Sequence, residues 1–142
     1  LKILNLAHKN DPNEIQVRAG HDAYLKNFGC IHYRTLSIDK INNKIIGQDK
    51  LARKNVNSKI KYDIRFHLYP GLTAVQTIGG NTLLIQINKN KALLFSSNEK
   101  NLKIEKSIFF GGQKVLDNYC IVISGAIENN EKIIDWEIRK KL

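Results

Sequence analysis

The sequence predicts an all-β protein, an antiparallel β-sandwich of about ten strands. Apolar and polar residues alternate with period two in short runs, and clusters of Asn, Asp, Gly or Lys break these runs roughly every 8 to 12 residues. No long stretch has the spacing of an amphipathic helix. Two packed antiparallel sheets are the simplest way to bury one apolar face of every strand. We expect residues 1–142 to form a single domain.

The first half of the chain contains five predicted strands, at residues 2–7, 14–19, 30–38, 44–49 and 62–69. Turns at 9–13 and 39–43 join the first four into hairpins. Residues 50–59 lack apolar alternation and hold four basic side chains, so we expect a loop there, with room for one helical turn.

Six more strands are predicted at residues 72–78, 83–87, 92–96, 103–110, 119–127 and 133–138. Turns are expected at Gly79-Gly80-Asn81 and at 88–91, and a loop at 111–118. The segment 119–127 is the most apolar and should be a central strand.

Length and composition restrict the class of protein. The chain has 142 residues, enough for one core, and 42% of them are hydrophobic, which excludes a disordered chain. No run approaches the roughly 18 to 20 apolar residues of a membrane span. The sequence contains no Met and its opening residues lack a signal-peptide pattern. We therefore expect Leu1 to be the start of a processed chain or the cut edge of a longer one.

The net charge of +10 has three interpretations. It suits nucleic acid, another polyanion such as an acidic polysaccharide, or no partner at all, because A- and T-rich codons enrich Lys. Only five of the 23 basic residues are Arg, the side chain that reads bases, so we expect no nucleic-acid partner. Basic residues concentrate between positions 40 and 65, with Arg53, Lys54 and Lys59 in the expected loop.

The two cysteines lie 90 residues apart, without a CxxC or Cys-His spacing for zinc. Both Cys30 and Cys120 precede an apolar residue, so we expect two buried free thiols. A single disulfide is the alternative in an extracytoplasmic chain.

The most suggestive local cluster is His21-Asp22 with Tyr24. An Asp can fix a His tautomer, and a Tyr hydroxyl can act as a general acid. Neighbouring strand residues point to opposite faces, however, so the alternative is a polar corner in which His21 or Asp22 bonds backbone groups at a turn.

Two strands each place a His and an Arg two residues apart: His32 with Arg34, and Arg65 with His67. Together these pairs could form a basic groove for carboxylates or sulfates. The alternative is that they are only the solvent-facing halves of amphipathic strands. A metal site of His21, His32 and His67 has no support from spacing, and no phosphate loop or GxSxG elbow is present.

Three stretches resemble motifs of heparinase II/III-like proteins. Residues 21–36 resemble the pattern H-D-[GA]-Y followed by F-G-x-x-H-x-R-x-L, residues 64–70 resemble R-F-H-L-x-P, and residues 102–111 resemble I-x-I-E-x-S-x-Y-x-G. Order and spacing agree across positions 14–138. Ala23, Lys106 and Phe109 depart from the usual Gly, Glu and Tyr.

The resemblance implies the C-terminal β-sandwich region of a larger enzyme that has an N-terminal helical toroid. Such enzymes cleave uronic-acid-containing polysaccharides by β-elimination. Their catalytic groups and metal-associated His residues come from the toroid and the earlier sheet motifs, which this chain lacks. We therefore expect no catalytic residue, metal ligand or cofactor in this chain, and we expect the chain alone to be inactive. The resemblance leaves room for a divalent metal bound upstream in the parent.

The expected partners are an acidic polysaccharide and the missing toroid, in the periplasm or cell envelope. The predicted substrate-binding residues are His21, Tyr24, His32, Arg34, Arg65 and His67. Two other classes remain open: a non-catalytic carbohydrate- or polyanion-binding module, and a structural sandwich domain of an envelope protein.

Overall fold

The computed structural model describes residues 1–55 and 58–141. This part of the chain forms eleven strands and one helical turn. In chain order the elements are β1 (Ile3–Asn10), β2 (Glu14–His21), α1 (Leu25–Phe28), β3 (Cys30–Asp39), β4 (Lys44–Arg53), β5 (Ile60–His67), β6 (Thr73–Gln76), β7 (Thr82–Asn88), β8 (Lys91–Ser97), β9 (Leu102–Phe109), β10 (Leu116–Ile127) and β11 (Glu131–Lys140). No helix among the described residues is long and apolar enough to cross a membrane.

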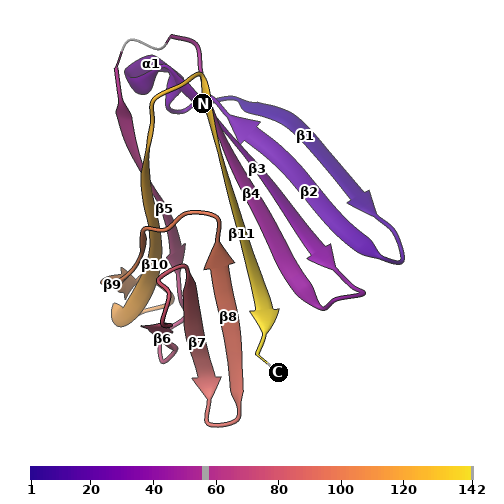
Figure 1. Ribbon diagram of the computed structural model, residues 1–142, viewed down its shortest axis with the longest axis vertical. Coiled ribbons are helices and arrows are strands. Elements are labelled where there is room, and N and C mark those ends of the chain that lie inside the picture. Colours follow the sequence, from indigo (N-terminus) through magenta and orange to yellow (C-terminus); the bar gives the residue numbers. More distant parts are fainter. Residues whose placement is uncertain (56–57, 142) are drawn as a thin grey trace. The chain divides into compact units, whose positions relative to one another are not determined.

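The chain packs as two compact units. The first unit comprises residues 1–61 and 126–137, and the second comprises residues 62–125 and 138–142. In the first unit β1, β2, β3 and β4 follow one another in an antiparallel sheet, and β11 lies beside β4 (Figure 1). The turns at 11–13 and 40–43 close its hairpins where the sequence predicts them.

The second unit contains two layers of antiparallel strands. One has the order β8-β7-β6 and the other the order β5-β10-β9, so the apolar β10 is central, as predicted. Phe66 on β5 meets Phe95 on β8 edge-on, with ring centroids 5.0 Å apart. Phe95, Leu83 and Ile121 are fully buried in this core. The predicted class, an antiparallel β-sandwich, is confirmed.

Both cysteines are free and buried, as predicted, Cys30 in the first unit and Cys120 in the second. Burial raises the pKa of each thiol, which favours the unreactive protonated form.

Several predicted boundaries are wrong, among them the end of the first strand, which continues to Asn10 inside the predicted turn 9–13. We expected a loop from residue 50, but β4 continues to Arg53 and pairs with β3 as far as Cys30. Asp49, Leu51 and Arg53 alternate on one face, and the half-buried Arg53 at the end of this face is not detected by a pattern based on apolar residues. Likewise β10 begins at Leu116, inside the predicted loop 111–118.

The helical turn also differs from the expectation. It lies at α1 and ends at Gly29, whose backbone is left-handed with φ of 61°. The expected position, 50–59, is strand to Arg53, and residues 56–57 lie outside the described ones.

Candidate functional site

A buried carboxylate organises the charged side chains of the first unit. Asp49 on β4 is fully buried. Its Oδ1 accepts hydrogen bonds from His32 Nε2 at 2.6 Å and from Arg34 Nε at 2.7 Å. Its Oδ2 accepts from Arg34 Nη2 at 3.1 Å and from Trp136 Nε1 at 2.8 Å. These four bonds compensate for the loss of water around the buried charge.

The hydrogen bonds continue from His32 to a second histidine. His21 Nδ1 accepts from the backbone N–H of Ala23 at 3.3 Å, so the proton of the neutral ring belongs on Nε2. His21 Nε2 lies 3.1 Å from His32 Nδ1, which must then accept and leave Nε2 of His32 to donate to Asp49. With both rings neutral, every bond runs in one direction, from His21 towards Asp49. We call His21, His32, Arg34, Asp49 and Trp136 the Asp49 cluster.

Electrostatics agrees with this assignment. Burial is the largest influence on Asp49 and raises its pKa, but hydrogen bonds from His32, Arg34 and Trp136 together outweigh it, so the net pKa lies below the ordinary value. Burial, and then the neighbouring His32, lower the pKa of His21. Near neutral pH the cluster therefore combines an ionised Asp49 with a neutral His21.

Strand register assembles the cluster. His21 lies opposite His32 in the β2–β3 pair, and the arginine of the cluster lies opposite Asp49 in the β3–β4 pair. Trp136 packs over Gly47, at which an added Cβ would collide with the indole ring. A glycine is therefore required for the Trp136 side chain to reach the carboxylate.

The structure brings together four predicted residues of the first unit. The Tyr24 ring meets the ring of His21 edge-on, at a centroid distance of 5.2 Å. His32 and Arg34 share a strand face, as predicted, but their side chains, 17% and 36% exposed, turn to a buried protein carboxylate. The solvent-facing alternative therefore does not describe His32, whereas Arg34 stays partly exposed. Substrate binding by all four remains a prediction.

Asp22 does not form a dyad with His21. Asp22 Oδ1 accepts from the backbone N–H of Lys2 at 2.6 Å, and His21 bonds the backbone of Ala23. The polar-corner alternative therefore describes His21 and Asp22, and His32 is the side chain that His21 contacts.

The Arg65 and His67 pair lies on an exposed face of β5 in the second unit. Arg65 Nη1 is 2.7 Å from Glu105 and Nη2 is 3.1 Å from Asp63. Ser124 also donates to Asp63, at 2.7 Å. Arg65 and His67 share a face, as predicted, but Arg65 is already paired with two protein carboxylates. Their role in binding substrate remains a prediction.

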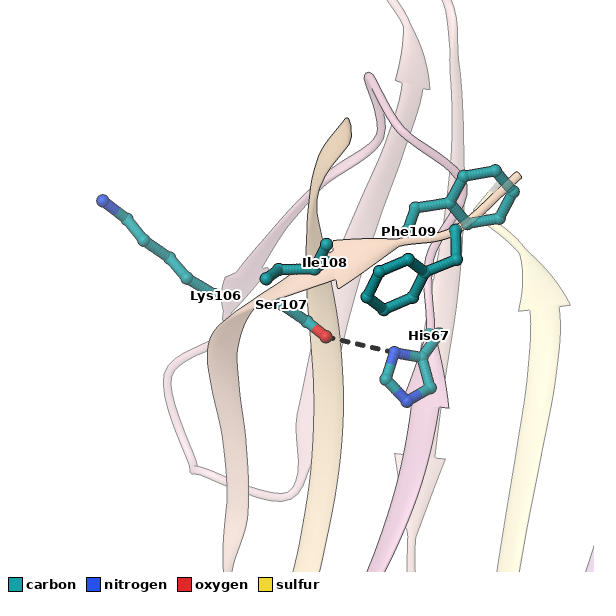
Figure 2. Close-up of a pocket in the computed structure, with 6 residues that line it drawn as sticks. His67, Lys106, Ser107, Ile108 and Phe109 are labelled. Carbon is teal, nitrogen blue, oxygen red and sulfur yellow. Dashed lines mark hydrogen bonds between the residues drawn. The ribbon is translucent and has the colours of Figure 1, made fainter. Parts of the chain in front are cut away.

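His67 borders a pocket with β9. Its Nδ1 lies 3.2 Å from Ser107 Oγ, and Figure 2 shows this hydroxyl directed at the imidazole. The pocket is lined by His67 and residues 106–110. The Tyr69 ring meets the Phe109 ring edge-on at 5.4 Å. Lys106 extends from the strand away from His67 (Figure 2).

Sequence reasoning missed Asp49, Trp136 and Ser107. Asp49 could have been found from the sequence, because extending the predicted hairpin from the pair Asp39 and Lys44 places Asp49 opposite Arg34. Trp136 could not have been found in this way, because it lies 87 positions from Asp49 in the sequence. Among the described residues no group of three or more His, Cys, Asp or Glu side chains is placed to hold a metal ion.

These features define a class: an all-β protein of antiparallel sheets, with a buried His-Arg-Asp cluster and an exposed aromatic pocket. Comparison with known proteins then gives the family. The chain belongs to the heparinase II/III-like, C-terminal family, whose model matches residues 3–137. No curated protein matches the sequence.

Several solved structures share the fold. Heparan sulfate lyase HepC from Pedobacter heparinus matches with a TM-score of 0.81 and 12% identity, over 98% of this chain and 22% of that one. A heparinase III gene product matches with a TM-score of 0.71 and 10% identity, over 96% and 21%. The protein Slr1438 from Synechocystis sp. PCC 6803 matches with a TM-score of 0.57 and 11% identity, over 99% and 65%. The chain thus spans about a fifth of the two heparinase-type proteins.

Proposed function

We propose that this chain is the C-terminal sheet region of a lyase that cleaves uronic-acid-containing polysaccharides by β-elimination. The family match over residues 3–137 carries the proposal. The likeness to heparan sulfate lyase HepC supports it by architecture alone, since identity is 12%. We also propose that the protein works in the periplasm or cell envelope.

We further propose that the 142 residues alone are inactive. β-Elimination requires a base for the proton α to the uronate carboxyl group, an acid for the leaving oxygen, and fixed positive charge for the enolate in a site that excludes water. Arg34 and Arg65, the predicted carboxylate-binding arginines, are both engaged by carboxylates of the protein. A preceding region of a longer protein would supply the catalytic groups.

An ultraviolet assay for unsaturated uronate products tests this proposal. The 142-residue chain and a longer product of the same gene are incubated with heparan sulfate and with other polyuronates. We expect absorbance to rise with the longer protein only. Turnover by the chain alone would overturn its proposed inactivity, and no turnover by the longer protein on any acidic polysaccharide would overturn the lyase assignment.

The second candidate is a non-catalytic module that binds polyanions, which the net charge of +10 favours. The predicted basic loop is a weaker candidate for this role than its sequence suggests. Lys59 is 2.6 Å from Glu128, and Arg53 lies half-buried in β4 and donates to the carbonyl of Ile127. Charge reversal at Arg53, Lys54 and Lys59 should lower the salt concentration of elution from a heparin resin if this stretch binds polyanions. Unchanged elution would exclude it.

A further inference from the structure

The pocket beside His67 combines exposed apolar area with polar groups. Phe110 is 81% exposed and Ile108 is 50% exposed, and Tyr69, next to Phe109, is 68% exposed. Large apolar side chains gathered at an exposed pocket are a feature of binding sites. The pocket is therefore a candidate binding site, and its side chains indicate the chemical class of the ligand.

The aromatic rings favour a ligand with a flat apolar side. Phe109 is held edge-on against Tyr69, at a centroid distance of 5.4 Å, which fixes its orientation in advance. An aromatic face carries partial negative charge and packs against groups whose hydrogens are partly positive. The C–H face of a pyranose ring has this character.

The polar groups of the pocket suit hydroxyl partners. Ser107 Oγ and His67 Nδ1 bond to each other at 3.2 Å, and either can donate or accept. The other ring nitrogen, Nε2, points away from Ser107 (Figure 2), so the imidazole can bond a second group. A sugar offers hydroxyls around the rim of its apolar face, where these two side chains would meet them.

Charge favours an acidic sugar over a neutral one. The second unit carries ten Lys and Arg side chains against four Asp and Glu. Two of those four acids, Asp63 and Glu105, are paired with Arg65. Lys106 lines the pocket but extends away from His67, so it attracts an anion over distance and does not complete the hydroxyl-binding pair.

We propose that this pocket binds one pyranose unit of an acidic polysaccharide. Phe109 and Phe110 pack against the sugar ring, and His67 and Ser107 bond its hydroxyls. The acidic class of ligand rests on the proposed function, which the pocket deepens by assigning a subsite outside the Asp49 cluster.

Titration of the ¹⁵N-labelled 142-residue chain by NMR tests the subsite. The probes are a heparan sulfate tetrasaccharide, a polyuronate tetrasaccharide and, as a neutral comparison, a dextran oligosaccharide. We expect the amide signals of residues 106–110 to shift with an acidic probe, and dextran to bind more weakly. Shifts confined to other residues, or no shift with either acidic probe, would overturn the proposal.

Variants make the test specific. Phe110→Ala removes an exposed ring and should weaken binding roughly threefold to tenfold without changing the thermal midpoint. His67→Ala should also weaken binding. Phe28→Ala, which removes an aromatic ring of 54% exposure in the first unit, is the matched control and should bind as the parent does. Equal affinity of the parent, Phe110→Ala and His67→Ala for the sugar would reject the subsite. The subsite would also be rejected if the parent bound no sugar but self-associated, and Phe110→Ala abolished that self-association.

Failure of the subsite and failure of the lyase assignment give different results. If the longer protein releases unsaturated product but Phe110→Ala leaves its KM unchanged and the tetrasaccharides do not bind residues 106–110, only the subsite is wrong. If the longer protein releases no such product, the lyase assignment is wrong, whatever the tetrasaccharides do.

Discussion

The chain contains two His and Arg pairs with the same spacing, and the fold treats them in different ways. His32 and Arg34 donate to the fully buried Asp49. Arg65 forms exposed ion pairs, and His67 bonds Ser107 at the border of an open pocket. The first pair is bound to a buried acid, while the partners of the second pair lie on an exposed surface.

The contrast between the two pairs shows what a strand pattern can predict and what it cannot. Period-two alternation determines that the two members of each pair share a face. It does not determine whether a neighbouring strand presents a buried acid to that face, as Asp49 on β4 does for Arg34. The pair bound to Asp49 contributes to stability. In the exposed pair, Nε2 of His67 points away from Ser107 and can bond a ligand.

Removal of the acid at each pair gives the largest expected contrast. Asp49→Ala leaves Arg34 without its buried partner and should lower the free energy of unfolding by about 3–5 kcal/mol. Glu105→Ala, the matched change beside Arg65, should cost at most about 1 kcal/mol, because that ion pair is exposed. Urea denaturation of both variants measures the contrast. If both variants lost a similar free energy of unfolding, the burial of Asp49 would not make its ion pair more stabilising than the exposed one.

A methyl group at Gly47 should disturb the buried cluster next most strongly. Its Cβ would collide with the indole of Trp136, the only tryptophan, so Gly47→Ala should cost about 1–3 kcal/mol. A changed Trp fluorescence spectrum should accompany the loss. Gln48→Ala is the control: it alters the adjacent, exposed position and should leave the spectrum as it is.

Acid should weaken the pair that is bound to the buried Asp49 more than the exposed pair. The pKa of Asp49 is lower in the fold than in the unfolded chain, where it is about 3.9. Its contribution is therefore complete above about pH 4 and disappears as the pH falls through the lowered value. Asp49→Asn should flatten the fall of unfolding free energy between about pH 5 and pH 2, by about 1.4 kcal/mol for each unit of pKa difference.

The exposed Asp63, whose pKa is lowered first by the hydrogen bond from Ser124, provides the comparison for this titration. Asp63→Asn should flatten the same curve less, because its environment is screened by water. Equal flattening by the two variants would contradict the assigned difference in burial.

The smallest expected effect concerns the histidine tautomers. Burial lowers the pKa of His21 from 6.5, so the ring should stay neutral until the pH falls below that value. The ¹⁵N shifts of His21 should show its proton on Nε2 at neutral pH. A proton on Nδ1 of His21 would reverse the assigned direction of the bonds. His32→Gln should release this constraint, with a stability change smaller than that of Asp49→Ala.

Much of the fold could be predicted because its strands alternate clearly. The strand containing Ile64 and Phe66, and the apolar strand that follows Tyr119, were identified from single runs of residues. The end of β4 is missed because Lys50 and Arg53 interrupt the apolar alternation, and Arg53 occupies an inward position where the pattern expects an apolar residue. A polar residue is accepted there only because its partners come from other strands, and those partners are not adjacent in sequence.

The all-β class, the shared faces of the His and Arg pairs, and the family could all be predicted from the sequence, because they depend on local alternation and on motifs in order. Which pair meets a buried acid depends on contacts between strands. The register of β3 with β4 brings Asp49 to Arg34, and β11 brings Trp136 to the same carboxylate. Burial depends on contacts between distant strands, so one predicted binding pair lies at a buried anion and the other beside an open aromatic pocket.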